Sequence, residues 1–141
     1  MHDLLRPAYR KVVADDIPWM LSLAHERYGA FDPGGALSFL LQALNSPLTL
    51  LLRSCARDAF LIAATVTPPW YPTATECHVM VLCAKPGAHW QAIKLLRGSV
   101  EWARLRKCVR WRFHSETQHD VAALCRRIGA TPDSPRYVID L

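Results

Sequence analysis

The sequence predicts an α+β fold in which helices cover both faces of a mixed, mostly antiparallel central sheet. Apolar strand-like runs alternate with segments of helical periodicity along the chain. The run at 77–84 is apolar on both faces, as a central strand covered on both sides should be. A long helical segment and a further strand-like run follow it, which predicts a βαβ unit with two parallel strands. With 141 residues, the chain is expected to form a single domain, 1–141.

The N-terminal half is expected to begin with a short strand at 9–13. An acidic pair, Asp15 and Asp16, with Pro18 in the first turn, predicts a helix start, and the helix should end near Gly29. The other elements predicted for this half are a loop at 31–35, a helix at 36–44 and an antiparallel hairpin of strands 48–54 and 59–66.

The C-terminal half contains the longest predicted helix, 88–107, whose apolar residues recur at helical spacing. The next strand, 108–114, alternates along its length. It should place Trp111 and Phe113 on one side and the intervening arginines on the other. The remaining elements predicted are a loop at 67–75, a short helix at 118–128 and a closing strand at 136–141.

The net charge of +5 is concentrated in the second half of the chain. Residues 1–70 hold six basic and six acidic side chains, whereas residues 71–141 hold eleven and six. An anionic partner is one interpretation, and a solvated basic helix face is the other. Because strand alternation separates Arg110 and Arg112 from the aromatic side chains, nucleic-acid binding is considered unlikely and is the lowest-ranked function.

Several classes of protein are excluded by composition. No apolar run reaches the ~18 residues of a membrane span, and the N-terminus lacks a signal-peptide core, so a cytoplasmic protein is expected. The five cysteines form no Cys-x-x-Cys pair, which argues against a disulfide scaffold. The cysteines and histidines also lack the short paired spacings of zinc sites, and no metal is predicted.

The order of elements resembles the GCN5-related N-acetyltransferases (GNAT) over nearly the whole chain. The stretches that carry the resemblance are the opening strand and acidic helix start at 10–17, the central strand ending in proline at 79–86, the cofactor helix at 92–104 and the penultimate helix at 124–130. The resemblance implies a transferase that moves an acyl group from acetyl-CoA to an amine acceptor, either a small molecule or a protein.

The cofactor loop of the family, Arg/Gln-x-x-Gly-x-Gly/Ala, matches residues 87–92 here. Ala92 keeps the last small residue, Gly87 replaces the basic residue and Trp90 replaces the middle glycine. This loop directs backbone N–H groups from a helix N-terminus toward a pyrophosphate. By resemblance, the cofactor-binding residues are Cys83, Lys85, Gly87, Ala88, His89, Trp90, Gln91, Ala92 and Gln118.

His114 and Glu116 are the candidate catalytic residues. They lie at the end of the strand that should run parallel to the central one, where family members hold the acyl group between two diverging strands. Either side chain could deprotonate an amine there. The alternative interpretation is a solvent-facing loop end. The tyrosine with which many family members return a proton to the leaving thiolate corresponds to Cys125.

The sequence leaves a non-enzymatic alternative open. Trp90 in the cofactor loop is compatible with a catalytically inactive GNAT-fold protein that serves as a structural or interaction module. Short proteins of this kind are encoded by tailed bacteriophages, and this chain resembles them in its length and altered loop. Its partners would then be other virion subunits or copies of itself, and its location the virion.

Overall fold

The computed structural model describes residues 9–29, 31–70, 73–113, 121–130 and 139. Its elements in chain order are β1 (Tyr9–Lys11), the 3-10 turn η1 (Ala14–Asp16), α2 (Ile17–Tyr28), α3 (Pro33–Leu44), β2 (Thr49–Ser54), β3 (Ala59–Val66), β4 (Glu76–Ala84), α4 (His89–Leu105), β5 (Arg110–Phe113) and α5 (Val121–Arg127). The closing strand predicted at 136–141 falls almost wholly outside the described residues.

The five strands form one mixed sheet in the order β1-β2-β3-β4-β5. The first three neighbouring pairs are antiparallel, and β4 pairs with β5 in parallel. The parallel pair follows from the crossover through α4, because a strand that returns through a helix enters the sheet in the same direction. The predicted α+β class and the βαβ unit around the central strand are therefore confirmed.

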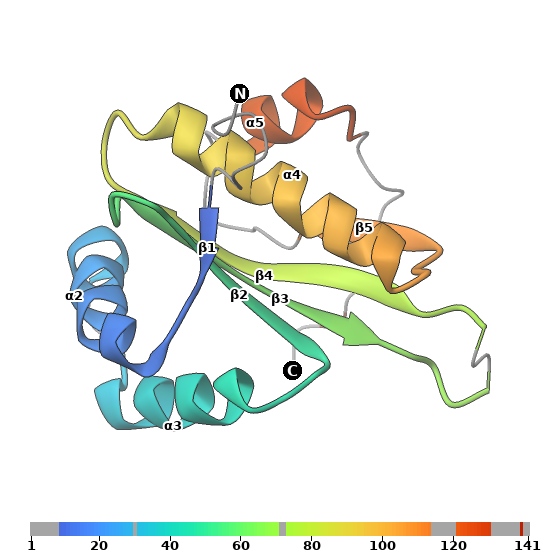
Figure 1. Ribbon diagram of the computed structural model, residues 1–141, viewed down its shortest axis with the longest axis horizontal. Coiled ribbons are helices and arrows are strands. Elements are labelled where there is room, and N and C mark those ends of the chain that lie inside the picture. Colours follow the sequence, from blue (N-terminus) through green and yellow to red (C-terminus); the bar gives the residue numbers. More distant parts are fainter. Residues whose placement is uncertain (1–8, 30, 71–72, 114–120, 131–138, 140–141) are drawn as a thin grey trace, which may run out of the picture.

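Helices cover both faces of the sheet (Figure 1). On one face, α4 packs Leu95 and Leu96 against Leu61 and Val79, all of them buried. On the other face, α2 and α3 enclose a second core. Its fully or nearly fully buried residues include Ile17, Met20, Leu23, Phe60 and Ile62. The three inner strands β2, β3 and β4 therefore contribute side chains to two separate cores, one on each face of the sheet.

The alternation predicted for β5 is confirmed. Trp111 and Phe113 pack against the core beneath α4. The Trp111 indole donates a hydrogen bond to the buried Ser99 hydroxyl (2.9 Å), which donates in turn to the Leu96 carbonyl (2.6 Å). The indole N–H of Trp111, which enters the core with its ring, therefore has a hydrogen-bond acceptor there.

Two element boundaries differ from the predictions for a local reason. The helix predicted at 36–44 begins at Pro33, because the Asp32 side chain caps it by accepting from the Gly34 amide (3.1 Å). β1 ends at Lys11 rather than at residue 13, because the Val13 amide donates to the Asp16 carboxylate (2.9 Å) and starts the helical turn. Within the described ranges, no helix has both the length and the apolar character needed to cross a membrane.

Candidate functional site

The candidate site lies where β4 continues beyond its pairing with the described part of β5. The parallel ladder runs from Glu76–Arg110 to Val79–Phe113, whereas β4 extends to Ala84. A bulge marks this point, because Val79 and Val81 pair with successive residues of β3 and Met80 lies between them. We call the side of Met80–Ala84 that faces away from β3 the outer edge of β4.

Leu82 and Ala84 direct their backbone groups toward this outer edge. The Lys85 amide donates to the Asp58 carbonyl (2.8 Å), so these two residues form a hydrogen-bonded pair of the β3–β4 ladder. Alternation along an antiparallel ladder then turns the N–H and C=O groups of Ala84 and Leu82 away from β3. The Leu82 carbonyl accepts its hydrogen bond from the Tyr28 hydroxyl instead, at 2.7 Å.

The loop after β4 delivers the N-terminus of α4 to the same end of the sheet. Gly87 has a positive φ of 85°, which suits glycine, and the Ala88 amide donates to the Lys85 carbonyl (3.1 Å). The N-cap residue, Ala88, makes no side-chain capping bond, and the first turn contains no acidic residue. Within the described part of the chain, the first-turn amides are therefore available to an anion, which the helix dipole also favours.

The predicted cofactor residues differ in their accessibility. Lys85, Gly87, His89 and Trp90 are exposed, Gln91 is partly exposed, and Ala88 and Ala92 are buried at the start of α4. The Cys83 side chain is buried in the core beneath α2, and this burial raises the pKa of its thiol to about 12. The same ladder turns the Cys83 N–H and C=O groups toward Phe60 of β3, so neither the thiol nor the backbone of Cys83 faces the outer edge of β4. His114, Glu116 and Gln118 lie outside the described residues.

Trp90 occupies the second position of α4 and is 58% exposed. The Arg127 guanidinium of α5 lies over its indole ring, 4.7 Å from the ring centroid. Such a cation–π contact holds the indole and the charge together. The exposed indole is thus paired with a cation near the helix N-terminus, a partner that the local sequence does not reveal.

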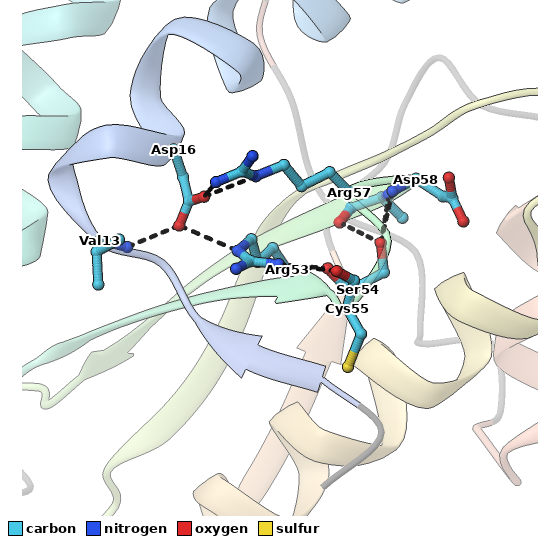
Figure 2. Close-up of polar contacts among 8 residues, drawn as sticks. Val13, Asp16, Arg53, Ser54, Cys55, Arg57 and Asp58 are labelled. Carbon is cyan, nitrogen blue, oxygen red and sulfur yellow. Dashed lines mark hydrogen bonds and ion pairs between the residues drawn. The ribbon is translucent and has the colours of Figure 1, made fainter.

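An ionic network centred on the buried Asp16 carboxylate lies at the turn between β2 and β3 (Figure 2). The fully buried Asp16 carboxylate pairs with Arg53 (3.0 Å) and Arg57 (2.9 Å), and Arg57 lies in the turn between β2 and β3. In that turn, the Ser54 hydroxyl accepts from the Asp58 amide (2.6 Å). Since the Asp58 carbonyl holds the Lys85 amide, the network fixes the start of the loop between β4 and α4.

The same network lowers the pKa of Asp16. Burial by itself raises the pKa of Asp16, but the hydrogen bond from the Val13 amide and the ion pairs with Arg57 and Arg53 outweigh it. The pKa of Asp16 therefore lies below its ordinary value. The carboxylate stays ionised at neutral pH and serves as a structural anchor.

A second polar cluster lies where β4 and β5 run side by side. Glu76 contacts His78 Nε2 (2.9 Å), Arg112 Nε (3.0 Å) and Arg110 (3.5 Å). The hydrogen bond with His78 and the charge of Arg112 hold the pKa of Glu76 below its ordinary value, against the opposing effect of burial. The two arginines therefore neutralise a carboxylate, and the described part of β5 offers no surface of interleaved aromatic and basic side chains.

Within the described residues, no group of three or more histidine, cysteine or acidic side chains is arranged to hold a metal ion. The five cysteines are free thiols. What the described site brings together is the outer edge of β4 and the N-terminus of α4. Sequence reasoning missed Tyr28 and Arg127, whose partners lie far away along the chain.

Solved structures of several acetyltransferases share this architecture. No protein-family model and no curated protein matches the sequence. An aminoglycoside 6'-N-acetyltransferase, AAC(6')-Ig from Acinetobacter haemolyticus, superposes with a TM-score of 0.77 at 15% identity, covering 94% of this chain and 97% of that one. The aminoglycoside N-acetyltransferase AAC(6')-Iy in complex with CoA gives 0.75 at 9% identity, with 94% and 92% covered.

The same fold also occurs in a protein described as a transcriptional regulator from Bacillus halodurans C-125, with a TM-score of 0.79, 14% identity and 94% and 98% coverage. The GNAT-like architecture predicted from the sequence is therefore confirmed. At these identities the likeness establishes the fold alone, and function has to be argued from the site.

Proposed function

We propose that this chain transfers an acyl group from acetyl-CoA to the nitrogen of an amine acceptor. One observation carries the proposal: two features that suit this donor meet at the end of β4. These are the outward-facing backbone groups of Leu82 and Ala84 and the uncapped N-terminus of α4. A protein of the same fold has been crystallised with CoA.

The described residues fit a CoA thioester in hydrogen-bonding capacity and charge. The amides of His89, Trp90 and Gln91 would hold the phosphates, and the exposed Lys85 and the Arg127 guanidinium add positive charge near them. The arm of CoA contains two amide groups, which suit the backbone groups on the outer edge of β4. We assign Gln118 to this site on the family resemblance.

When bound, acetyl-CoA supplies a thioester whose acyl carbon bonds to the acceptor nitrogen as its carbon–sulfur bond breaks. One proton must then leave the amine, and one must reach the thiolate. We assign the first transfer to Glu116 or His114. Cys125 stands at the family's proton-donor position, and burial raises the pKa of its thiol, so it keeps its proton at neutral pH.

Trp90 favours a second candidate function. Trp90 stands where the family has glycine, and Arg127 holds its indole in place. A protein that has lost CoA binding would tolerate such a bulky side chain at this position. In that case the chain is an inactive GNAT-fold structural module, such as a bacteriophage virion protein. Binding of the donor separates the two functions.

The experiment is titration calorimetry with acetyl-CoA. We expect weak binding, with a Kd above roughly 10 µM, or about −7 kcal/mol or weaker. His89→Glu places a carboxylate in the first turn of α4, where it suits the helix dipole but repels phosphate, so it should abolish binding without lowering the Tm. The control is Gln42→Glu, which makes the same change of charge on the exposed face of α3 and should leave binding unchanged.

Absence of binding by the unaltered chain would contradict the transferase and favour the structural module. Equal binding by His89→Glu and the unaltered chain would show that the ligand lies elsewhere.

A further inference from the structure

The last residue of α2 reaches the outer edge of β4. Tyr28 ends this helix, and its hydroxyl donates to the Leu82 carbonyl at 2.7 Å, across 54 positions of sequence. Burial raises the pKa of the Cys83 thiol, and the neighbouring Tyr28 acts against this rise. Tyr28 thus joins the end of α2 to β4.

The bond to Leu82 occupies a carbonyl that the described strands leave out of their ladders. An extended, amide-bearing segment adds to a strand by donating to its outward-facing carbonyls and accepting from its outward-facing amides. Along the outer edge of β4, the Leu82 carbonyl is one of these acceptors, and Tyr28 donates to it. A ligand arm laid along this edge would meet the tyrosine hydroxyl at that carbonyl.

We propose that Tyr28 is a gate for the acyl donor: its hydroxyl leaves the Leu82 carbonyl when the amide-bearing arm of a CoA thioester binds along β4. This inference rests on the proposed function. It makes Tyr28 a residue that sets the affinity for the donor.

The position of Tyr28 allows it to move. It lies in the last turn of α2, the residue is 43% exposed, and the next residue is Gly29. Gly29 has a φ of 78°, and no heavy atom would lie within 4 Å of a Cβ added there. A ring at a helix end, followed by an uncrowded glycine, can swing away from β4 without repacking the core.

The test compares two ligands on the unaltered chain and on Tyr28→Phe. CoA contains the arm, whereas adenosine 3',5'-bisphosphate contains phosphates but no amide arm. Phenylalanine keeps the ring and removes the competing hydroxyl. We expect Tyr28→Phe to bind CoA about two- to tenfold more tightly, as the loss of one competing hydrogen bond predicts, and to bind the bisphosphate unchanged.

A second measurement does not depend on a variant. In the unaltered chain with 13C-labelled tyrosine, CoA should shift the Tyr28 ring resonance, and the bisphosphate should leave it in place. Unchanged or weaker CoA binding by Tyr28→Phe, or a Tyr28 resonance that CoA does not move, would overturn the gate while leaving the transferase intact. If neither ligand binds to either protein, the gate and the proposed function both fail.

Discussion

Gly98 is the residue at which side-chain packing opposes helix propensity. It lies in the middle of α4, where alanine would normally stabilise a helix by about 1 kcal/mol. A Cβ at this position, however, would lie 2.6 Å and 2.7 Å from two ring atoms of Tyr9. The absence of a side chain therefore allows β1 to pack against α4.

We predict that Gly98→Ala lowers the free energy of unfolding by about 1–3 kcal/mol, because the Tyr9 ring must shift out of its packed position. Urea denaturation provides the measurement. The matched control is the same substitution in a Tyr9→Ala background, where the clash is absent and the helix propensity of alanine should stabilise the protein. A stabilising effect in the unaltered background would contradict the packing of Tyr9 on this helix.

At the scale of elements, sequence patterns predicted the strands and helices well because these depend on local periodicity. The hairpin of β2 and β3 and the crossover through α4 follow from apolar alternation and helical spacing alone. The start of α3 was predicted three residues late, because Gly34 and Gly35 suggest a loop. The prediction overlooked the cap that Asp32 provides to a helix beginning at Pro33.

Of the candidate site, only the features formed by residues that are neighbours in sequence could be predicted. The loop at 87–92 lies at the N-terminus of α4 as expected, because a strand followed by a helix is a local pattern. The contacts of Tyr28 with Leu82 and of Asp16 with Arg57 join residues 54 and 41 positions apart. Such pairs depend on how α2 lies across the sheet, which single-sequence patterns do not determine.

The N-terminus of α4 gives a prediction at this scale. Trp90→Gly removes the indole from the helix end at which we propose that the phosphates bind, and we expect tighter binding of CoA in titration calorimetry. The substitution should also lower the Tm modestly, because glycine costs a helix about 1 kcal/mol and the contact with Arg127 is lost.

Arg127→Gln distinguishes steric obstruction from charge in this experiment. It keeps the indole but removes the cation, so affinity for CoA should fall if the guanidinium attracts phosphate. A Trp90→Gly variant that binds CoA no better than the unaltered chain would show that the indole does not obstruct the site.

On the scale of the whole molecule, two lowered carboxyl pKa values link stability to pH. Asp16 joins the start of α2 to the β2–β3 turn, and Glu76 joins β4 to β5. In each case the folded-state pKa lies below that of the unfolded chain. Their contributions are therefore complete above the unfolded pKa of about 4 and are lost as the pH falls through the folded-state values.

We expect the free energy of unfolding to fall steadily below about pH 4, as measured by urea denaturation at successive pH values. Asp16→Asn should already lose about 3–5 kcal/mol at pH 7, because it leaves Arg53 buried without its countercharge, and its stability should then depend less on pH than that of the unaltered chain. Glu76→Gln should lower the free energy of unfolding by less than Asp16→Asn does, because the arginines that pair with Glu76 are more exposed. Parallel pH profiles for the unaltered chain and Asp16→Asn would show that Asp16 is not the carboxylate through which acid destabilises the fold.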